Sequence, residues 1–320
     1  MDCTSGFRYG ELSGPMSGTC VGVQQQDGGV DIDTPPGQVC YGTGLVMACF
    51  AEAPTNPQTF TQNTTINTDT SLLCATTLNQ TGACVIAAQS ITINGGIYVA
   101  AVGTKPLVFV ADQTITVTGR IDVASYRQFM SVGAAGDVPG CNAGTAPTGT
   151  SGGAGGSFGG LGGAGAAVGT AGMPGAVLTP TVLRGGCPGQ TGADNVAPMG
   201  PGTGGHGGGA VFLIANTSIS VAGTGVIDAS GEGGAGATSS TSGGGGGGGS
   251  GGYIGFDTPS LMVSGAVFAN GGGGGEASGA STTGVNGADP TLPTTAALGG
   301  AGGSNFGTDG GNGSVGATLN

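Results

Sequence analysis

Two aspartates occupy the same position in two copies of a recurring sequence pattern, and they are the residues best placed to do chemistry. Asp122 follows the letters GRI and Asp228 follows GVI, each at a position that we expect to point outward from a strand. Stacked carboxylates would offer Ca²⁺ the oxygen ligands that it prefers. An ordinary solvated polar ladder is the alternative. Calcium is the one cofactor that the sequence raises, and otherwise none is predicted.

The other charged residues form no catalytic pattern. Solenoid enzymes that act on polysaccharides use clustered acids with an Arg or Lys, and here only Arg120 stands beside an Asp inside a repeated unit. His206 is the single histidine, and we expect it to pack where a glycine-rich stretch returns to a strand. No Ser-His-Asp grouping and no phosphate-binding GxxxxGK[ST] motif is evident. We therefore predict no catalytic residue and no cofactor-binding residue.

Hydroxyl side chains recur on the outward side of the same pattern. These residues are Thr92, Thr114, Thr116, Thr118, Ser218 and Ser220. Flat threonine arrays occur in ice-binding proteins, so the row predicts a face that binds an ordered surface. The alternative is the ordinary β-propensity of Thr on a solvent-exposed face. The array decays to Ala222 and Met262 in later copies.

The pattern that positions these residues occurs four times, at 84–100, 107–125, 211–230 and 253–270. Each copy joins an apolar run, a kernel [IL]-x-[IV]-x-Gly and a second alternating run. A period of two places every second side chain on one face of a strand. One unit is too thin to bury its own apolar face, so copies must stack. We therefore predict an all-β fold, a right-handed parallel β-solenoid.

Glycine-rich stretches enter the repeat at one point, after the second strand run. Glycine accounts for 77 of the 320 residues, far above its usual share. Residues 151–169 show a near-triplet Gly-Gly-X beat, and three residues is the period of the polyproline II helix. We predict packed polyglycine II helices on one flank of the solenoid, with flexible linkers as the alternative.

The chain is expected to divide into an N-terminal cap followed by alternating coils and glycine-rich stretches. Residues 1–56 contain several cysteines and are interpreted as a disulfide-stapled cap over one end of the solenoid. The later segments are first coils at 57–125, an insertion at 126–209, a coil at 210–230, an insertion at 231–252, a coil at 253–270 and a glycine-rich C-terminal segment at 271–320.

Eight cysteines without a CxxC pair indicate disulfides rather than a zinc site. We expect Cys74 to pair with Cys84, and Cys141 with Cys187. The N-terminal cysteines are expected to pair among themselves; they are Cys3, Cys20, Cys40 and Cys49. Disulfides form in oxidising compartments, so the predicted location is extracellular or the outer cell surface.

Charge and hydropathy exclude two classes of partner. The net charge of −12 disfavours a phosphate backbone, so no nucleic acid is expected. No apolar stretch approaches the roughly 18 residues of a membrane span. A basic segment followed by an apolar one is also missing at the N-terminus, so Met1 is interpreted as the start of a mature or trimmed chain.

Several phrases resemble the glycine-rich secreted proteins of myxobacteria and related predatory bacteria: CYGTGLVMACF, KPLVFVADQTITVTGRIDVAS, TPTVLRGGCPG, GGHGGGAVFLIA and SGAVFANGGGGGE. The resemblance covers most of the chain. It implies an exported bacterial surface protein and carries over no catalytic residue. The glycine triplets are also similar to the polyglycine II bundles of phage tail-tip adhesins and of a springtail antifreeze protein, which is a local analogy of architecture.

These observations predict a secreted or cell-surface structural or adhesive protein, with self-assembly into extracellular filaments as its extension. The expected partners are other copies of the chain, or a surface glycan or protein. No enzymatic activity is predicted. An ice-binding protein that uses a threonine or polyglycine face is the first alternative, and a carbohydrate-active β-helix enzyme is the second.

Overall fold

A computed structural model of the chain describes residues 37–194, 200–238, 242–279, 282–301 and 308–316. The described residues form strands and no helix, and no segment among them could cross a membrane as a helix. The all-β class is therefore confirmed.

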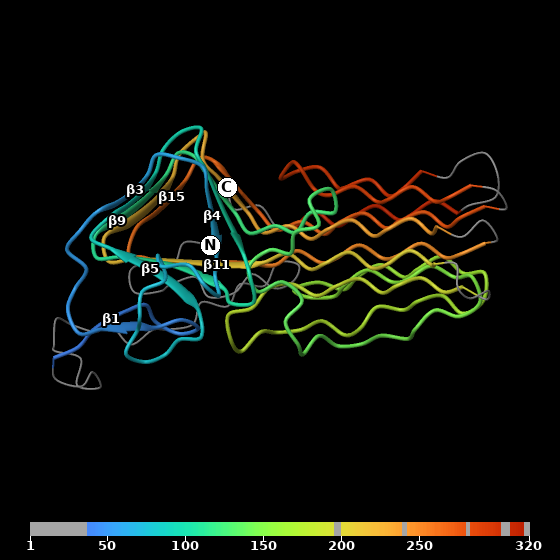
Figure 1. The fold of residues 1–320 in the computed structure, drawn as a ribbon, viewed down its shortest axis with the longest axis horizontal. Helices are drawn as coiled ribbons and strands as arrows, with labels where there is room; N and C mark the ends of the chain where they lie inside the picture. Colours follow the sequence, from blue (N-terminus) through green and yellow to red (C-terminus); the bar gives the residue numbers. More distant parts are fainter. Residues whose placement is uncertain (1–36, 195–199, 239–241, 280–281, 302–307, 317–320) are drawn as a thin grey trace, which may run out of the picture.

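Three parallel sheets contain the strands of the repeats (Figure 1). The first sheet consists of β5 (Cys84–Ala88), β8 (Leu107–Ala111), β11 (Ala210–Ala215) and β14 (Tyr253–Asp257). The second consists of β3 (Gln58–Phe60), β6 (Ile91–Ile93), β9 (Thr114–Val117), β12 (Ser218–Val221) and β15 (Leu261–Val263). The third consists of β4 (Thr64–Asn67), β7 (Tyr98–Val102), β10 (Arg120–Asp122), β13 (Val226–Asp228) and β16 (Ala266–Phe268).

Each copy of the repeat contributes one strand to each sheet, and its kernel sets the register. In the second sheet Ile91 pairs with Ile115, and Ile115 pairs with Ile219. Because side chains alternate along a strand, these three isoleucines point to the same side, where all are fully buried. They belong to one core, shared by the three sheets, that also contains Phe109 and Ile121.

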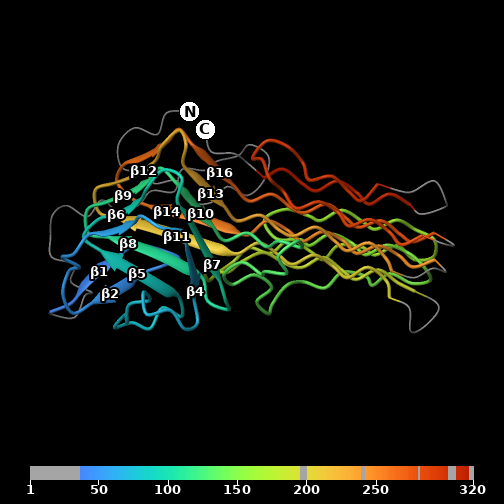
Figure 2. The same ribbon diagram turned by 45° about the horizontal axis from the view of Figure 1, so that its top comes forward.

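The two central strands of the first sheet, β8 and β11, are buried on both faces. They are continuous apolar runs, LVFVA and AVFLIA, which is the pattern of strands covered on each side. An antiparallel hairpin of β1 (Val39–Tyr41) and β2 (Ala48–Phe50) covers the outer face (Figure 2). Its side chains pack with Val108 and Phe212. The described part of the predicted cap therefore covers a sheet face.

The prediction of a single right-handed β-solenoid with polyglycine II helices on one flank is wrong. The described residues form separate parallel sheets of four, five and five strands packed side by side. The glycine-rich stretches leave from the strand ends and run along the long axis of the molecule, away from the sheets (Figure 1). The reason is their glycine content: without Cβ atoms these segments pack backbone against backbone among themselves, and they join the strands only at their ends, as where Tyr253 N–H donates to Gly209 O at 3.0 Å.

The described residues of 143–209, 230–252 and 270–316 form these extended segments, which we call the glycine bundle. Neighbouring segments are joined by backbone hydrogen bonds at every third residue. Thus Gly186, Gly189 and Gly192 donate to the carbonyl oxygens of Gly208, Gly205 and Gly202. A three-residue spacing gives each segment three sides, and each side either contacts a neighbour or faces solvent.

The run of seven glycines, Gly243–Gly249, lies at the centre of the bundle. A Cβ at Gly244 would lie 2.0 Å from Ser151 O, and one at Gly246 would lie 2.0 Å from Thr203 O. At Gly245 it would lie 2.1 Å from Gly275 O. Three successive positions thus face three different segments at contact distance. No residue larger than glycine fits at any position from Gly244 to Gly249, which explains the run.

Three disulfides lie among the described residues. Cys74 pairs with Cys84 and Cys141 pairs with Cys187, which confirms both predicted pairs. The third joins β1 to β2; it is Cys40–Cys49. Cys3 and Cys20 lie outside the described residues.

Candidate functional site

The paired aspartates of the repeat meet where the third sheet reaches the glycine bundle. β10 and β13 pair in parallel with Asp122 opposite Asp228. Arg120 lies between the two carboxylates: its Nε donates to Asp122 Oδ2 at 2.7 Å, and its Nη2 donates to Asp228 Oδ2 at 2.6 Å. One guanidinium therefore bridges both acids.

The remaining carboxylate oxygens also have donors. Asp122 Oδ1 accepts from the Ala124 N–H at 3.0 Å, and Asp228 Oδ1 accepts from the Ser230 N–H at 2.9 Å. The Tyr126 hydroxyl donates to Asp122 Oδ2 at 2.7 Å. Both aspartates are buried, so the expectation that they point into solvent is wrong. Tyr126, which follows β10, places its hydroxyl against both carboxylates.

Arg120 supplies the positive charge that the predicted calcium would have supplied. Within the described parts of the chain, no group of three or more His, Cys, Asp or Glu side chains is arranged to hold a metal ion. Asp122 and Asp228 come together as the sequence suggested, but as the two arms of an ion-pair network.

The electrostatics of this pair follow from burial. Desolvation, with the Asp122 carboxylate as the second cause, raises the pKa of Asp228 to about 6. Two carboxyls in different environments are the ingredients of general acid and base chemistry. However, the Asp122 and Asp228 side chains are only 1% and 0% exposed, and a substrate would have to displace Arg120 and Tyr126 to reach them. The geometry favours a structural tie.

A second charged cluster, which sequence reasoning missed, lies at the base of the bundle. His206 Nδ1 contacts Asp137 Oδ2, and Asp137 Oδ1 accepts the Gly207 N–H at 2.7 Å. On its other side, His206 Nε2 lies 3.8 Å from Glu232 Oε2. Arg127 Nη2 then lies 2.7 Å from Glu232 Oε1. The result is a row in which acidic and basic side chains alternate.

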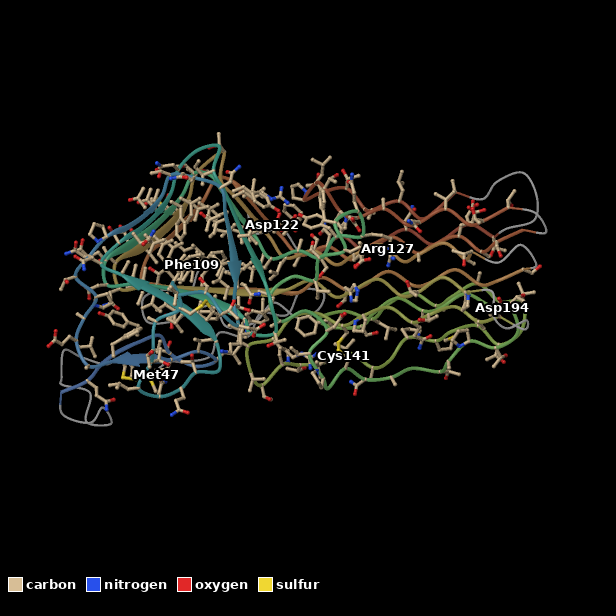
Figure 3. All side chains as sticks on the ribbon, in the orientation of Figure 1. Met47, Phe109, Asp122, Arg127, Cys141 and Asp194 are labelled. Atoms are coloured by element: carbon tan, nitrogen blue, oxygen red, sulfur yellow. A yellow bond between two sulfur atoms is a disulfide. The ribbon has the colours of Figure 1, made fainter. Side chains whose placement is uncertain are left out.

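This row joins parts of the chain that are distant in sequence. Arg127 also donates from its backbone N–H to Asp289 at 3.0 Å, and from Nε to Gly233 O at 2.7 Å. Figure 3 places Arg127 at the end of the bundle nearest the sheets and Asp194 at the far end. The cluster therefore ties the sheets to three segments of the bundle.

The pKa values of two groups in this cluster, His206 and Glu232, are both raised. The hydrogen bond to Asp137 is the main cause of a raised pKa for His206, and burial raises the pKa of Glu232. The sequence did contain a feature that could have identified these residues, namely ionisable groups within glycine-rich stretches. Charged residues make up only 7% of the chain, so an ionisable group inside a glycine-rich stretch needs a partner to be buried.

The predicted hydroxyl face lies on the second sheet. Thr92 pairs with Thr116, and Thr116 pairs with Ser220 in one in-register column. Thr114 pairs with Ser218 in the adjacent column. All of these side chains are half-buried and alternate with core residues. Thr118 differs from the others, because its hydroxyl donates to the Ile93 carbonyl at 2.8 Å. The strands of this sheet carry no charged residue.

A second uncharged surface lies along one side of the glycine bundle, where sequence reasoning assigned no site. Residues 143–182, which we call the uncharged layer, contain no Asp, Glu, Lys, Arg or His. Leu161, Val168 and Val182 are 66%, 64% and 63% exposed. On the opposite side of the bundle in Figure 1, the segments of 283–301 and 308–316 carry Asp289 and Asp309. The bundle thus has one side without ionisable residues and one side with two aspartates.

No protein-family model, no curated protein and no solved structure matches this chain.

Proposed function

We propose that this protein is a secreted or cell-surface structural or adhesive protein whose glycine bundle is a rigid arm built to present a surface. The observation that carries the proposal is the central segment Gly243–Gly249, which is enclosed by other segments and bonded to them through its backbone. Gly247 N–H donates to Gln190 O at 2.9 Å, while Gly205 N–H donates to Gly247 O at 2.8 Å. An arm held by such bonds keeps its shape without a side-chain core.

Two further features support a load-bearing role outside the cell. Cys141–Cys187 closes the base of the bundle, and such bonds persist in oxidising compartments. The ionisable groups at the junction with the sheets are paired with one another and mostly buried. These ion pairs stabilise the junction between the sheets and the glycine bundle.

Negative-stain electron microscopy tests the proposal. Wild-type particles should show a body with an arm of constant length. The Gly245→Val variant, in which a side chain would meet Gly275 O, should lose the arm's defined outline while keeping the body. Gly163→Val is the matched control, because nothing lies within 4 Å of a Cβ there. An arm of variable length in the wild-type protein would contradict the proposal.

A second candidate function is binding to ice or another ordered surface through the second sheet. It is favoured by the two in-register hydroxyl columns through Thr116 and Thr114. Ice-recrystallisation and thermal-hysteresis assays test it directly. Thr116→Lys should abolish any activity, whereas Thr65→Lys, at an exposed position of β4 in the third sheet, should not. No activity in the wild-type protein would exclude this candidate.

A further inference from the structure

We infer that the uncharged layer is a self-association surface that joins two copies of this chain side by side. The inference deepens the proposed structural function by naming the partner and the surface. It rests on that function, and three independent features of the layer support it.

Charge is the first feature. The chain carries a net charge of −12, so two copies repel each other wherever acidic surfaces meet. The segments on the opposite side of the bundle in Figure 1 contain Asp289 and Asp309, and Asp194 lies at the far end of the bundle in Figure 3. Residues 143–182 are a long, charge-free side of the bundle. Two copies that meet through this side bring no like charges into contact.

Exposed apolar side chains are the second feature. Besides Leu161, Val168 and Val182, Met173 is 48% and Val177 is 45% exposed. Burial of exposed apolar side chains against a partner is favourable, because it releases water. The opposite side of the bundle also exposes apolar side chains, among them Leu298, but its segments carry Asp289 and Asp309 as well. Of the two sides, only the uncharged layer combines exposed apolar side chains with a lack of charge.

The fixed backbone of the layer is the third feature. Gly152 N–H donates to Ala166 O at 2.8 Å, and Gly165 N–H donates to Gly172 O at 2.8 Å. Met173 N–H donates to Thr145 O at 2.9 Å. The layer is therefore ordered before binding, so association loses little conformational entropy.

The antiparallel arrangement of the layer identifies a second copy as the partner. Adjacent segments within it run in opposite directions, as the pairing of 152 with 166 and of 155 with 163 shows. A twofold axis that lies in the plane of such a layer, across its segments, brings the outward faces of two copies together and reverses the direction of the segments. Because the layer already contains segments of both directions, each copy presents the same pattern of segments to the other. Outward side chains recur at every third residue in both, so the rows of one copy can fit between the rows of the next. This is the geometry of an isologous dimer.

Sedimentation velocity across a range of protein concentrations tests the inference. The wild-type protein should form a dimer that persists in high salt, since its contacts are apolar. The double variant Leu161→Asp, Val168→Glu should weaken dimerisation by at least roughly 100-fold, because it buries charges in the interface. Leu298→Asp is the matched control, with a side chain 66% exposed on the opposite side of the bundle, and it should dimerise as the wild type does.

Three results would overturn the inference: a wild-type monomer at every concentration, equal dissociation by Leu298→Asp, or no effect of the double variant. Circular dichroism and disulfide mapping on the same samples verify that each variant is folded. If the wild type is monomeric but microscopy still shows an arm of constant length, the dimer is excluded and the structural function stands. An arm of variable length would count against the structural function itself.

Discussion

Backbone hydrogen bonds join the strands of the sheets and the segments of the glycine bundle, but the two regions pack in opposite ways. In the sheets, side chains such as Phe109 and Ile115 fill the space between the sheets. In the bundle, backbones meet directly, and a Cβ at Gly247 would lie 2.0 Å from Ala154 O. Packed side chains stabilise the sheets, whereas the absence of side chains lets the backbones of the bundle approach closely enough to bond to one another. The two regions should therefore respond to opposite kinds of substitution.

Removal of side-chain atoms should have its largest effect in the sheets. Phe109 is fully buried and makes an edge-to-face contact with Phe60, with ring centroids 6.2 Å apart. Phe109→Ala should lower the free energy of unfolding by about 4 kcal/mol through lost burial and a residual cavity. Denaturant titration measures this, with the exposed Phe129→Ala as the control. If Phe109→Ala lowered the free energy of unfolding no more than the control does, side-chain packing would not be what stabilises the sheets.

Loss of the charge that joins the two regions should have a slightly smaller, pH-dependent effect. Arg120→Met leaves the buried Asp122 and Asp228 carboxylates without their cation, which should cost about 3 kcal/mol at pH 7. The cost should shrink as the pH falls below about 6, the value to which the pKa of Asp228 is already raised, because neutral carboxyls need no cation. Denaturation at several pH values checks this. A loss independent of pH would mean that Arg120 acts by packing alone.

Addition of one methyl group should destabilise the bundle. Gly247→Ala forces the central segment away from Ala154, and overpacking of this kind costs about 2 kcal/mol. The same change at Gly163, where a Cβ meets nothing within 4 Å, should stay within about 0.5 kcal/mol of the wild type. Thermal unfolding of both variants makes the comparison. Equal stability of the two variants would show that the bundle is not closely packed.

The smallest predicted effect is the pH dependence of the His206 contact. The pKa of His206 is raised in the folded protein, so the folded state binds the proton more tightly than the unfolded state. This contribution to stability is fully present below pH 6.5 and is lost as the pH rises through the folded value. The side chain is 45% exposed, so solvent screening limits the effect to less than about 1 kcal/mol. His206→Gln should remove this pH dependence, and a variant that retains the full wild-type slope would assign it to another group.

Local periodicity predicted the strands well, because it reports which side chains share a face. The kernel isoleucines Ile91, Ile115 and Ile219 align in the structure as they do in the repeat. The same pattern could not predict how the sheets are arranged or that a hairpin covers the first of them. Those features depend on contacts such as that of Tyr41 with Asp112, whose partners are far apart in the chain.

The candidate sites were predicted in part for the same reason. The repeat placed Asp122 beside Asp228, but it could not show that Arg120 would turn inward to neutralise both. The contact of Asp137 with His206 has no local pattern at all, because the two residues come from different glycine-rich segments. Glycine content alone could not distinguish an ordered bundle from a flexible linker. An ordered bundle requires that the backbones of segments distant in sequence lie close enough to form hydrogen bonds, and the sequence does not show this.

Amide hydrogen exchange tests most directly the central claim that the glycine bundle is an ordered body held by its backbone. The amides of Gly244, Gly246 and Gly249 donate to carbonyls of neighbouring segments at 2.8–2.9 Å. They should therefore exchange as slowly as the amides of β8 and β11. Exchange at the rate of an unstructured chain in Gly243–Gly249, with the strands still protected, would contradict the claim.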